Sequence, residues 1–126
     1  MAVEKKDIDG AIESDHPGVV LRRDFLDPLG LSANGLALAL RVPAPRITEI
    51  IRGRRGVSAD TALRLARYFE TSGEFWLAVQ AAYDLARARA GGTSDEVEPR
   101  AHDDKAVRKA LQKAARRRAD DFKERL

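Results

Sequence analysis

The sequence predicts an all-α protein in which five helices form a helix-turn-helix domain and one additional helix follows at the C-terminus. Three observations predict this fold. Apolar residues recur at spacings of three and four along most of the chain. Ser, Asp, Pro and Gly stand where such helices would begin and end. No segment shows the strict alternation of apolar and polar residues that is typical of a β-strand.

The composition is typical of one compact domain with tails. The chain has 126 residues and a formal net charge of +3, with 44% hydrophobic, 34% charged and 6% aromatic residues. We therefore expect a core made mainly of Leu, Ile, Val and Ala. The absence of cysteine excludes disulfides and thiolate chemistry. Because the chain has neither an apolar run of about 20 residues nor an apolar signal core near Met1, we expect a cytoplasmic protein without a membrane span.

The pattern divides the chain into four segments. Residues 1–15 are acidic and aperiodic, which predicts a flexible N-terminal arm. Residues 16–90 carry the five periodic helices of the expected helix-turn-helix domain. Residues 91–102 are predicted to be a linker, because Gly and Ser are followed by an acidic stretch with Pro99. Residues 103–126 predict a separate basic amphipathic helix.

Each helix is predicted from its start, its stop and its apolar positions. The expected starts are Val19, Ser32, Ala44, Ser58, Ser72 and Asp103, with His16 preceding the first. The expected breaks are Pro28 to Gly30, Val42 to Pro43, Gly53 and Gly91. The three serines suit N-caps, whose hydroxyl oxygens accept hydrogen bonds from backbone N–H groups. In the helix that begins after Ser58, the residues predicted to lie inside are Ala62, Leu63, Leu65, Ala66 and Phe69. The apolar positions of the other helices of the domain are Val20, Leu21, Phe25, Leu26, Leu36, Ala37, Leu40, Ile47, Ile50, Ile51, Phe75, Trp76, Leu77, Val79, Tyr83 and Leu85.

The stretch from Leu36 to Gly53 predicts a helix-turn-helix motif. Two short helices joined by a turn of three or four residues must cross steeply, and Ala37 allows their backbones to approach. This geometry places the first turns of the second helix in a major groove of DNA. One residue departs from the pattern, because Arg41 stands where glycine usually adopts a left-handed conformation.

The outward positions of the second helix are candidate base-reading residues: Ala44, Pro45, Arg46, Thr48 and Glu49. Arg46 has the donors for guanine O6 and N7, and Ala44 and Pro45 offer apolar contacts to a thymine methyl group. Thr48 suits a base edge or a phosphate. Glu49 has two interpretations, which are contact with cytosine N4 and orientation of Arg46.

A second group of residues is predicted to contact DNA phosphates. Residues 16–92 contain many arginines and no lysine, although a GC-rich genome would produce the same bias. Arginine forms bidentate contacts with phosphate. The candidates flank the reading helix and comprise Ser32, Asn34, Arg52, Arg54 and Arg55.

Other classes of site are disfavoured by spacing. Phe75, Trp76 and Tyr83 have helical spacing, which favours core or dimer packing over a ligand cage. His16 and His102 lack companions at metal-ligand spacing. No nucleophile has a base in a recognisable pattern, and no glycine-rich phosphate loop is present. We therefore expect no enzyme activity, no cofactor and no metal.

The C-terminal segment carries a basic face that includes Lys109, Lys113 and the run from Arg116 to Arg118. Three interpretations remain open for this face. It could lie along DNA phosphates, bind an acidic patch on a protein, or simply be solvated.

Residues 16–89 resemble the HigA antitoxin family, which belongs to the phage-repressor-like (XRE) group. The resemblance rests on His16-Pro17-Gly18-Val19-Val20-Leu21, Phe25 to Ser32, Arg46 to Arg55, Thr61 to Ala66, and Phe75-Trp76-Leu77 with Gln80, Tyr83 and Asp84. Typical members end near Gly91, so the last 35 or so residues depart from the pattern.

The resemblance implies an antitoxin of a type II toxin–antitoxin module. Such proteins neutralise a HigB-type, RelE-like mRNA-cleaving toxin and repress their own operon as homodimers on a palindromic operator. The implied dimer contacts lie on the last helix of the domain, at Phe75, Trp76, Val79 and Tyr83. The alternative is a stand-alone helix-turn-helix repressor without a toxin partner.

Overall fold

The computed structural model describes residues 15–100 and 104–125, and every regular element within them is helical. The all-α prediction is therefore confirmed for these residues. The chain divides into two units, one ending at Gly92 and one beginning at Thr93. Of the predicted N-terminal arm, only Asp15 is among the described residues. Asp103, the predicted start of the last helix, lies outside them.

The first predicted helix is three consecutive helical segments with a wide turn in the middle. Helix α2 (Pro17–Val20) leads into the π-helix η1 (Leu21–Leu26) and then α3 (Asp27–Leu29). In η1 the Asp27 N–H bonds the Arg22 carbonyl, five residues back. A proline lacks an N–H and clashes with the carbonyl four residues before it in an α-helix, and the wider turn just before Pro28 relieves this conflict. Gly30, in the left-handed conformation, ends the segment.

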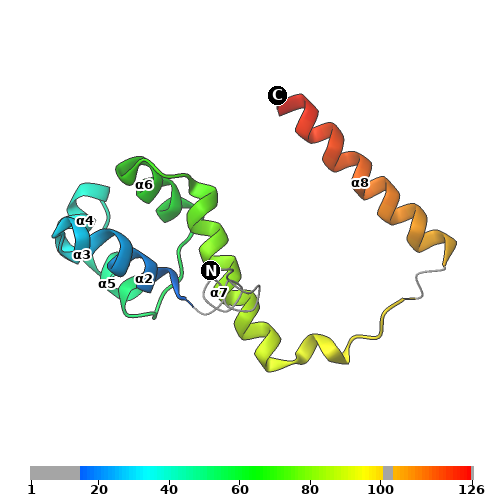
Figure 1. The fold of residues 1–126 in the computed structure, drawn as a ribbon, viewed down its shortest axis with the longest axis horizontal. Coiled ribbons are helices and arrows are strands. Elements are labelled where there is room, and N and C mark those ends of the chain that lie inside the picture. The colour runs from blue at the N-terminus through cyan, green and yellow to red at the C-terminus, as the bar shows by residue number, and fades with distance from the viewer. Residues whose placement is uncertain (1–14, 101–103, 126) are drawn as a thin grey trace, which may run out of the picture. The chain divides into compact units, whose positions relative to one another are not determined.

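Four further helices complete the first unit (Figure 1). They are α4 (Ala33–Leu40), α5 (Ala44–Ile51), α6 (Ala59–Phe69) and α7 (Gly73–Gly91). The predicted serine caps are confirmed, because the hydroxyls of Ser32, Ser58 and Ser72 accept from the N–H groups of Gly35, Thr61 and Phe75. Helix α4 packs on α5, and α6 packs on both α4 and α7.

The core is aliphatic, with a single tryptophan at 0% exposure. Its buried apolar members are Val20, Leu21, Leu26, Leu36, Ala37, Leu40, Ile47, Ile50, Val57, Ala62, Leu65, Ala66 and Trp76. The indole N–H of Trp76 donates to the Thr71 hydroxyl at 2.9 Å, which satisfies its polar atom. The prediction for Leu63 was wrong: its side chain is 65% exposed, because it lies on the outer face of α6. Leu77 and Leu85, on α7, are also exposed.

Gly18 allows the backbone of α2 to touch the backbone of α5. A Cβ atom on Gly18 would overlap the carbonyl oxygen of Ile50 and crowd Cα of Ile51. These neighbours are backbone atoms, so no side chain can rotate to make room. Helix α5 is thus fixed by a contact that only glycine permits.

The second unit contains η2, a 3-10 helix (Thr93–Glu96), and the long helix α8 (Lys105–Arg125). The short helix η2 lies within the segment, residues 91–102, that we predicted to be a linker. The Asp104 carboxylate accepts from the N–H of Ala106 at 2.8 Å and from the Arg100 guanidinium. Asp104 therefore performs the capping role at the start of α8.

We predict that Gly18→Ala destabilises the first unit by about 1–3 kcal/mol, because the added methyl group must push α2 away from α5. Gly91→Ala is the matched control, since a Cβ at Gly91, in the last turn of α7, meets open space. Thermal unfolding of both variants by circular dichroism measures the difference. Equal melting temperatures for the two variants would contradict the close contact.

His16 is a buried N-cap that works in its neutral form. Its Nδ1 accepts a hydrogen bond from the Gly18 N–H at 2.9 Å. Its ring packs against the Tyr83 ring in a T-shaped arrangement, with the ring centroids 4.8 Å apart. Burial lowers the pKa of His16 below its ordinary value of 6.5; Arg87 lowers it further, while Asp84 acts in the opposite direction. The folded chain therefore binds a proton at His16 less readily than the unfolded chain.

The stabilisation from neutral His16 is therefore present above pH 6.5 and is lost as the pH falls through the lowered pKa. We predict that the melting temperature of the wild-type chain falls more steeply between pH 7 and pH 5 than that of His16→Asn, since Asn can cap without titrating. Parallel pH profiles of the two chains would show that His16 is not the titrating cap.

Candidate nucleic-acid interface

Helices α4 and α5 are joined by a turn of three residues that begins in a left-handed conformation. Arg41 has φ 58° and ψ 47°, as its position in the sequence predicts. The N–H of Val42 bonds the Ala37 carbonyl at 3.0 Å, and the N–H of Arg41 bonds that of Leu38 at 3.2 Å. This Schellman arrangement satisfies carbonyls at the end of α4. The turn therefore sets the crossing of the two helices, at the strain cost of a non-glycine residue.

The amino end of α5 carries two prolines. Pro43 is its N-cap residue and makes no side-chain cap, while Pro45 lies in the first turn. Proline suits this place because the N–H that it lacks would have no partner within the helix. The first turn of α5 also carries the partial positive charge of the helix dipole. An anionic ligand is favoured at this end.

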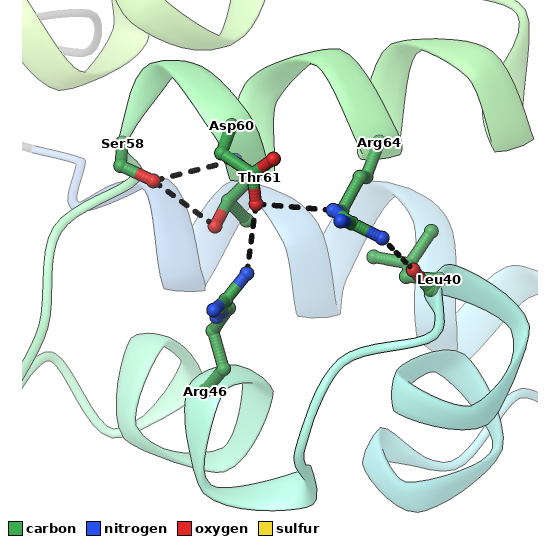
Figure 2. Close-up of polar contacts among 6 residues, drawn as sticks. All are labelled: Leu40, Arg46, Ser58, Asp60, Thr61 and Arg64. Atoms are coloured by element: carbon green, nitrogen blue, oxygen red, sulfur yellow. Dashed lines mark hydrogen bonds and ion pairs between the residues drawn. The ribbon is translucent and has the colours of Figure 1, made fainter.

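Arg46, Asp60 and Arg64 form a clamp that joins three helices (Figure 2). Asp60 Oδ2 accepts from Arg46 Nη1 of α5 at 2.8 Å and from Arg64 Nε at 3.0 Å. Arg64 Nη1 also donates to the Leu40 carbonyl at the end of α4, at 2.8 Å. The ion pair with Asp60 holds the side chain of Arg46, which is 31% exposed and therefore still accessible to a ligand. The clamp links both helices of the motif to α6.

Glu49 does not pair with Arg46, which was one of the two roles that the sequence suggested for it. It pairs with Arg55 at 2.8 Å, whereas Arg46 pairs with Asp60. The interpretation that Glu49 orients Arg46 is therefore wrong for this structure. The hydroxyl of Thr48 donates to the Ala44 carbonyl at 3.3 Å, one turn back in α5. Both side chains are half-buried.

The five predicted phosphate-contacting residues are exposed. Ser32 uses its oxygen as an acceptor in the cap of α4, which leaves its hydroxyl hydrogen available. Arg52 ends α5, and the tight turn at Gly53 (φ 74°) carries the chain onward. The N–H of Arg54 bonds the Glu49 carbonyl at 2.8 Å, so the basic turn is folded against α5.

The four predicted dimer residues do not share one environment. Trp76 is 0% exposed and packs inside the chain, where Phe25 and Phe75 contact it. It therefore has no surface to offer a partner, and this part of the prediction is corrected. Phe75, Val79 and Tyr83 are half-buried and keep some exposed surface on α7.

The part of the chain that the structure describes holds no group of three or more His, Cys, Asp or Glu side chains that could bind a metal ion. His102 lies outside the described residues. None of the described helices is both long enough and apolar enough to cross a membrane.

The sequence reasoning missed the contacts that hold α5 in place. The i, i+4 spacing of Asp60 and Arg64 was a visible signal for half of the clamp. The pairing of Asp60 with Arg46 and the close backbone approach of Gly18 to Ile50 join segments that are distant in the sequence, and no local pattern predicts them. Gln80 is another such case, because its Oε1 accepts from the Val57 N–H at 2.7 Å.

The fold and the motif define a helix-turn-helix domain, and comparison with known proteins agrees. The helix-turn-helix family HTH_3 matches residues 23–76. Virulence-associated protein I of Dichelobacter nodosus is 56% identical over 73 residues, which are 58% of this chain and 68% of that protein.

Two solved structures from Pseudomonas aeruginosa are also similar. One is the protein PA4674 in complex with its 18-bp operator DNA, with 46% identity, a TM-score of 0.66, and coverage of 69% of this chain and 97% of that chain. The other is antitoxin HigA with the higBA promoter, with 46% identity, a TM-score of 0.64, and coverage of 68% and 96%. The chain belongs to the HigA antitoxin family within the XRE-type helix-turn-helix proteins.

We predict that Arg64→Met lowers the free energy of unfolding by about 1–2 kcal/mol, because the Leu40 carbonyl loses a charged donor. Arg67→Met is the control, since Arg67 lies on the same helix and has no hydrogen bond or ion pair with a described residue. Urea denaturation followed by tryptophan fluorescence reports both values. An equal and small loss in the two variants would show that the clamp does not stabilise the motif.

Proposed function

We propose that this chain binds operator DNA with the first turns of α5 in the major groove. The observation that carries the proposal is the accessible amino end of α5, where Arg46 is held by Asp60 at 2.8 Å beside two prolines. The similar structure of PA4674 is a complex with operator DNA, which supports the same use of the fold here. The assigned base-reading residues are Ala44, Pro45, Arg46, Thr48 and Glu49.

The phosphate contacts in this proposal come from both sides of α5. Ser32 and Asn34 stand in the first turn of α4, where a helix N-terminus favours a phosphate. Arg52, Arg54 and Arg55 supply the charge after α5. Arg55 must exchange its pairing with Glu49 for a phosphate, an exchange between two anionic partners of similar geometry.

A homodimer extends the proposal to a palindromic operator. Two copies related by two-fold symmetry would present their α5 helices one helical turn of DNA apart, about 34 Å. The exposed parts of Phe75, Val79 and Tyr83 on α7 are the proposed contacts between the copies.

Toxin neutralisation is the second half of the proposed function. Membership of the HigA family supports an antitoxin that binds a HigB-like, mRNA-cleaving toxin and represses its own operon. The chain would act by binding rather than by catalysis, without a cofactor and in the cytoplasm. A stand-alone repressor is the outcome if no toxin is found.

We predict that Arg46→Ala weakens binding to the operator by roughly 1–3 kcal/mol and relaxes one base preference. Arg46→Lys is the matched variant, because it keeps the charge but cannot form the bidentate contact with guanine. We expect it to lose base preference while keeping more affinity. Fluorescence anisotropy with operator duplexes carrying single base changes measures both effects. Unchanged affinity and preference in both variants would mean that α5 does not read the bases through Arg46.

Co-expression tests the antitoxin half. Each reading frame adjacent to the gene is expressed alone and then together with this chain, with growth and mRNA integrity as readouts. We expect one frame to arrest growth and the chain to restore it. Arg46→Ala should still rescue growth while failing to repress a promoter reporter. If no adjacent frame is toxic and rescued, the chain is a stand-alone repressor.

A further inference from the structure

Helix α8 carries an unusual density of positive charge. Between Lys105 and Ala119 the chain has no acidic residue and seven cationic ones, which are Lys105, Arg108, Lys109, Lys113, Arg116, Arg117 and Arg118. Fifteen helical residues span about 22 Å. This segment lies outside the helix-turn-helix match at residues 23–76, so the reading helix does not account for it.

Five of these cations share one side of α8, and we call them the cationic face: Lys105, Arg108, Lys109, Lys113 and Arg116. Two adjacent surface hollows show the arrangement. Lys109, Lys113 and Arg116 line one together with Gln112, and Lys105, Arg108 and Lys109 line the other, again with Gln112. Arg118 lies on the other side of α8 and Arg117 at the edge of the face next to Lys113, because successive helical residues turn by about 100°.

The cationic face is exposed and electrostatically unsatisfied within the part of the chain that the structure describes. All five side chains are exposed, and none forms an ion pair with a described residue, whereas Arg100 before the helix is paired with Asp104. Five cations on one side of a helix repel one another, so this face favours a polyanion. Duplex DNA carries one negative charge per about 1.7 Å of its axis with both strands counted, so a stretch as long as this face presents more phosphates than the face has cations.

A membrane surface fits this helix less well. Interfacial helices carry bulky aromatic or aliphatic residues opposite their charges. The side opposite the cationic face offers Val107 and Leu111 with several alanines, and the single aromatic residue in the sequence of α8, Phe122, comes after the cationic stretch has ended.

We propose that the cationic face of α8 binds phosphates of duplex DNA independently of base sequence. The proposal builds on the proposed operator binding by α5, to which α8 would add contacts outside the bases that α5 reads. It assigns the extension a role in affinity and salt dependence rather than in base preference.

The test compares two double variants of the full chain that remove the same charge from the same helix. Lys109→Gln/Lys113→Gln alters the cationic face, and Arg117→Gln/Arg118→Gln alters the rest of α8. Gln preserves helix propensity. Binding to an operator duplex with long flanks and to a scrambled duplex of equal length is measured at several salt concentrations.

We expect Lys109→Gln/Lys113→Gln to reduce the slope of log K against log salt by about two, since each lost phosphate contact removes about 0.9. The loss should be equal for both duplexes, and the control variant should keep most of the wild-type slope. Equal slopes in the two variants would overturn the proposal. The proposal would also be overturned if Lys109→Gln/Lys113→Gln kept its DNA binding but lost binding to vesicles of phosphatidylcholine and phosphatidylglycerol, or to a co-expressed toxin. If the wild-type chain does not prefer the operator, the proposed function of α5 fails, while the slopes on the scrambled duplex still decide the role of α8.

Discussion

The backbone contact between Gly18 and Ile50 is the constraint on which the placement of α5 depends. The outer side chains of α5 are the ones proposed to contact DNA, so the contacts that hold this helix must lie on its inner face. Here the support is another helix in direct backbone contact, together with the fully buried Ile47 and Ile50. Because protein interiors are close-packed, a contact between two backbones leaves less freedom than one between side chains. The first helix therefore contributes to the placement of α5, although none of its own residues is among those proposed to contact DNA.

Polar contacts then complete what the core begins. The Asp60 carboxylate joins Arg46 to Arg64, and Arg64 holds the Leu40 carbonyl, so one carboxylate connects both helices of the motif to α6. A side chain held in place loses less conformational entropy when it binds. The same reasoning applies to the basic turn, where the pair between Glu49 and Arg55 and the Arg54 N–H hold the loop against α5. The proposed interface is thus largely preformed in this structure.

Sequence reasoning predicted the features that depend on local chemistry. Serine caps, the left-handed Arg41 and the bounds of α5 follow from what one or two residues can do, and the structure confirms them. It failed where a partner comes from a distant segment, as with Asp60 for Arg46 and Ile50 for Gly18. Trp76 and Leu63 show a related limit: helical periodicity indicates an apolar face but does not say which neighbour covers it. The π-turn before Pro28 depends on how a steric conflict is resolved, which the sequence leaves open.

The central claim is that one small scaffold fixes the amino end of α5 for contact with operator DNA. The most direct measurement is a titration of the ¹⁵N-labelled chain with promoter DNA from its own gene, followed by NMR. The account predicts that the largest amide shift changes fall on Ala44 to Glu49 and on Arg52 to Arg55. Changes confined to α7, with the amides of α5 unmoved, would contradict it.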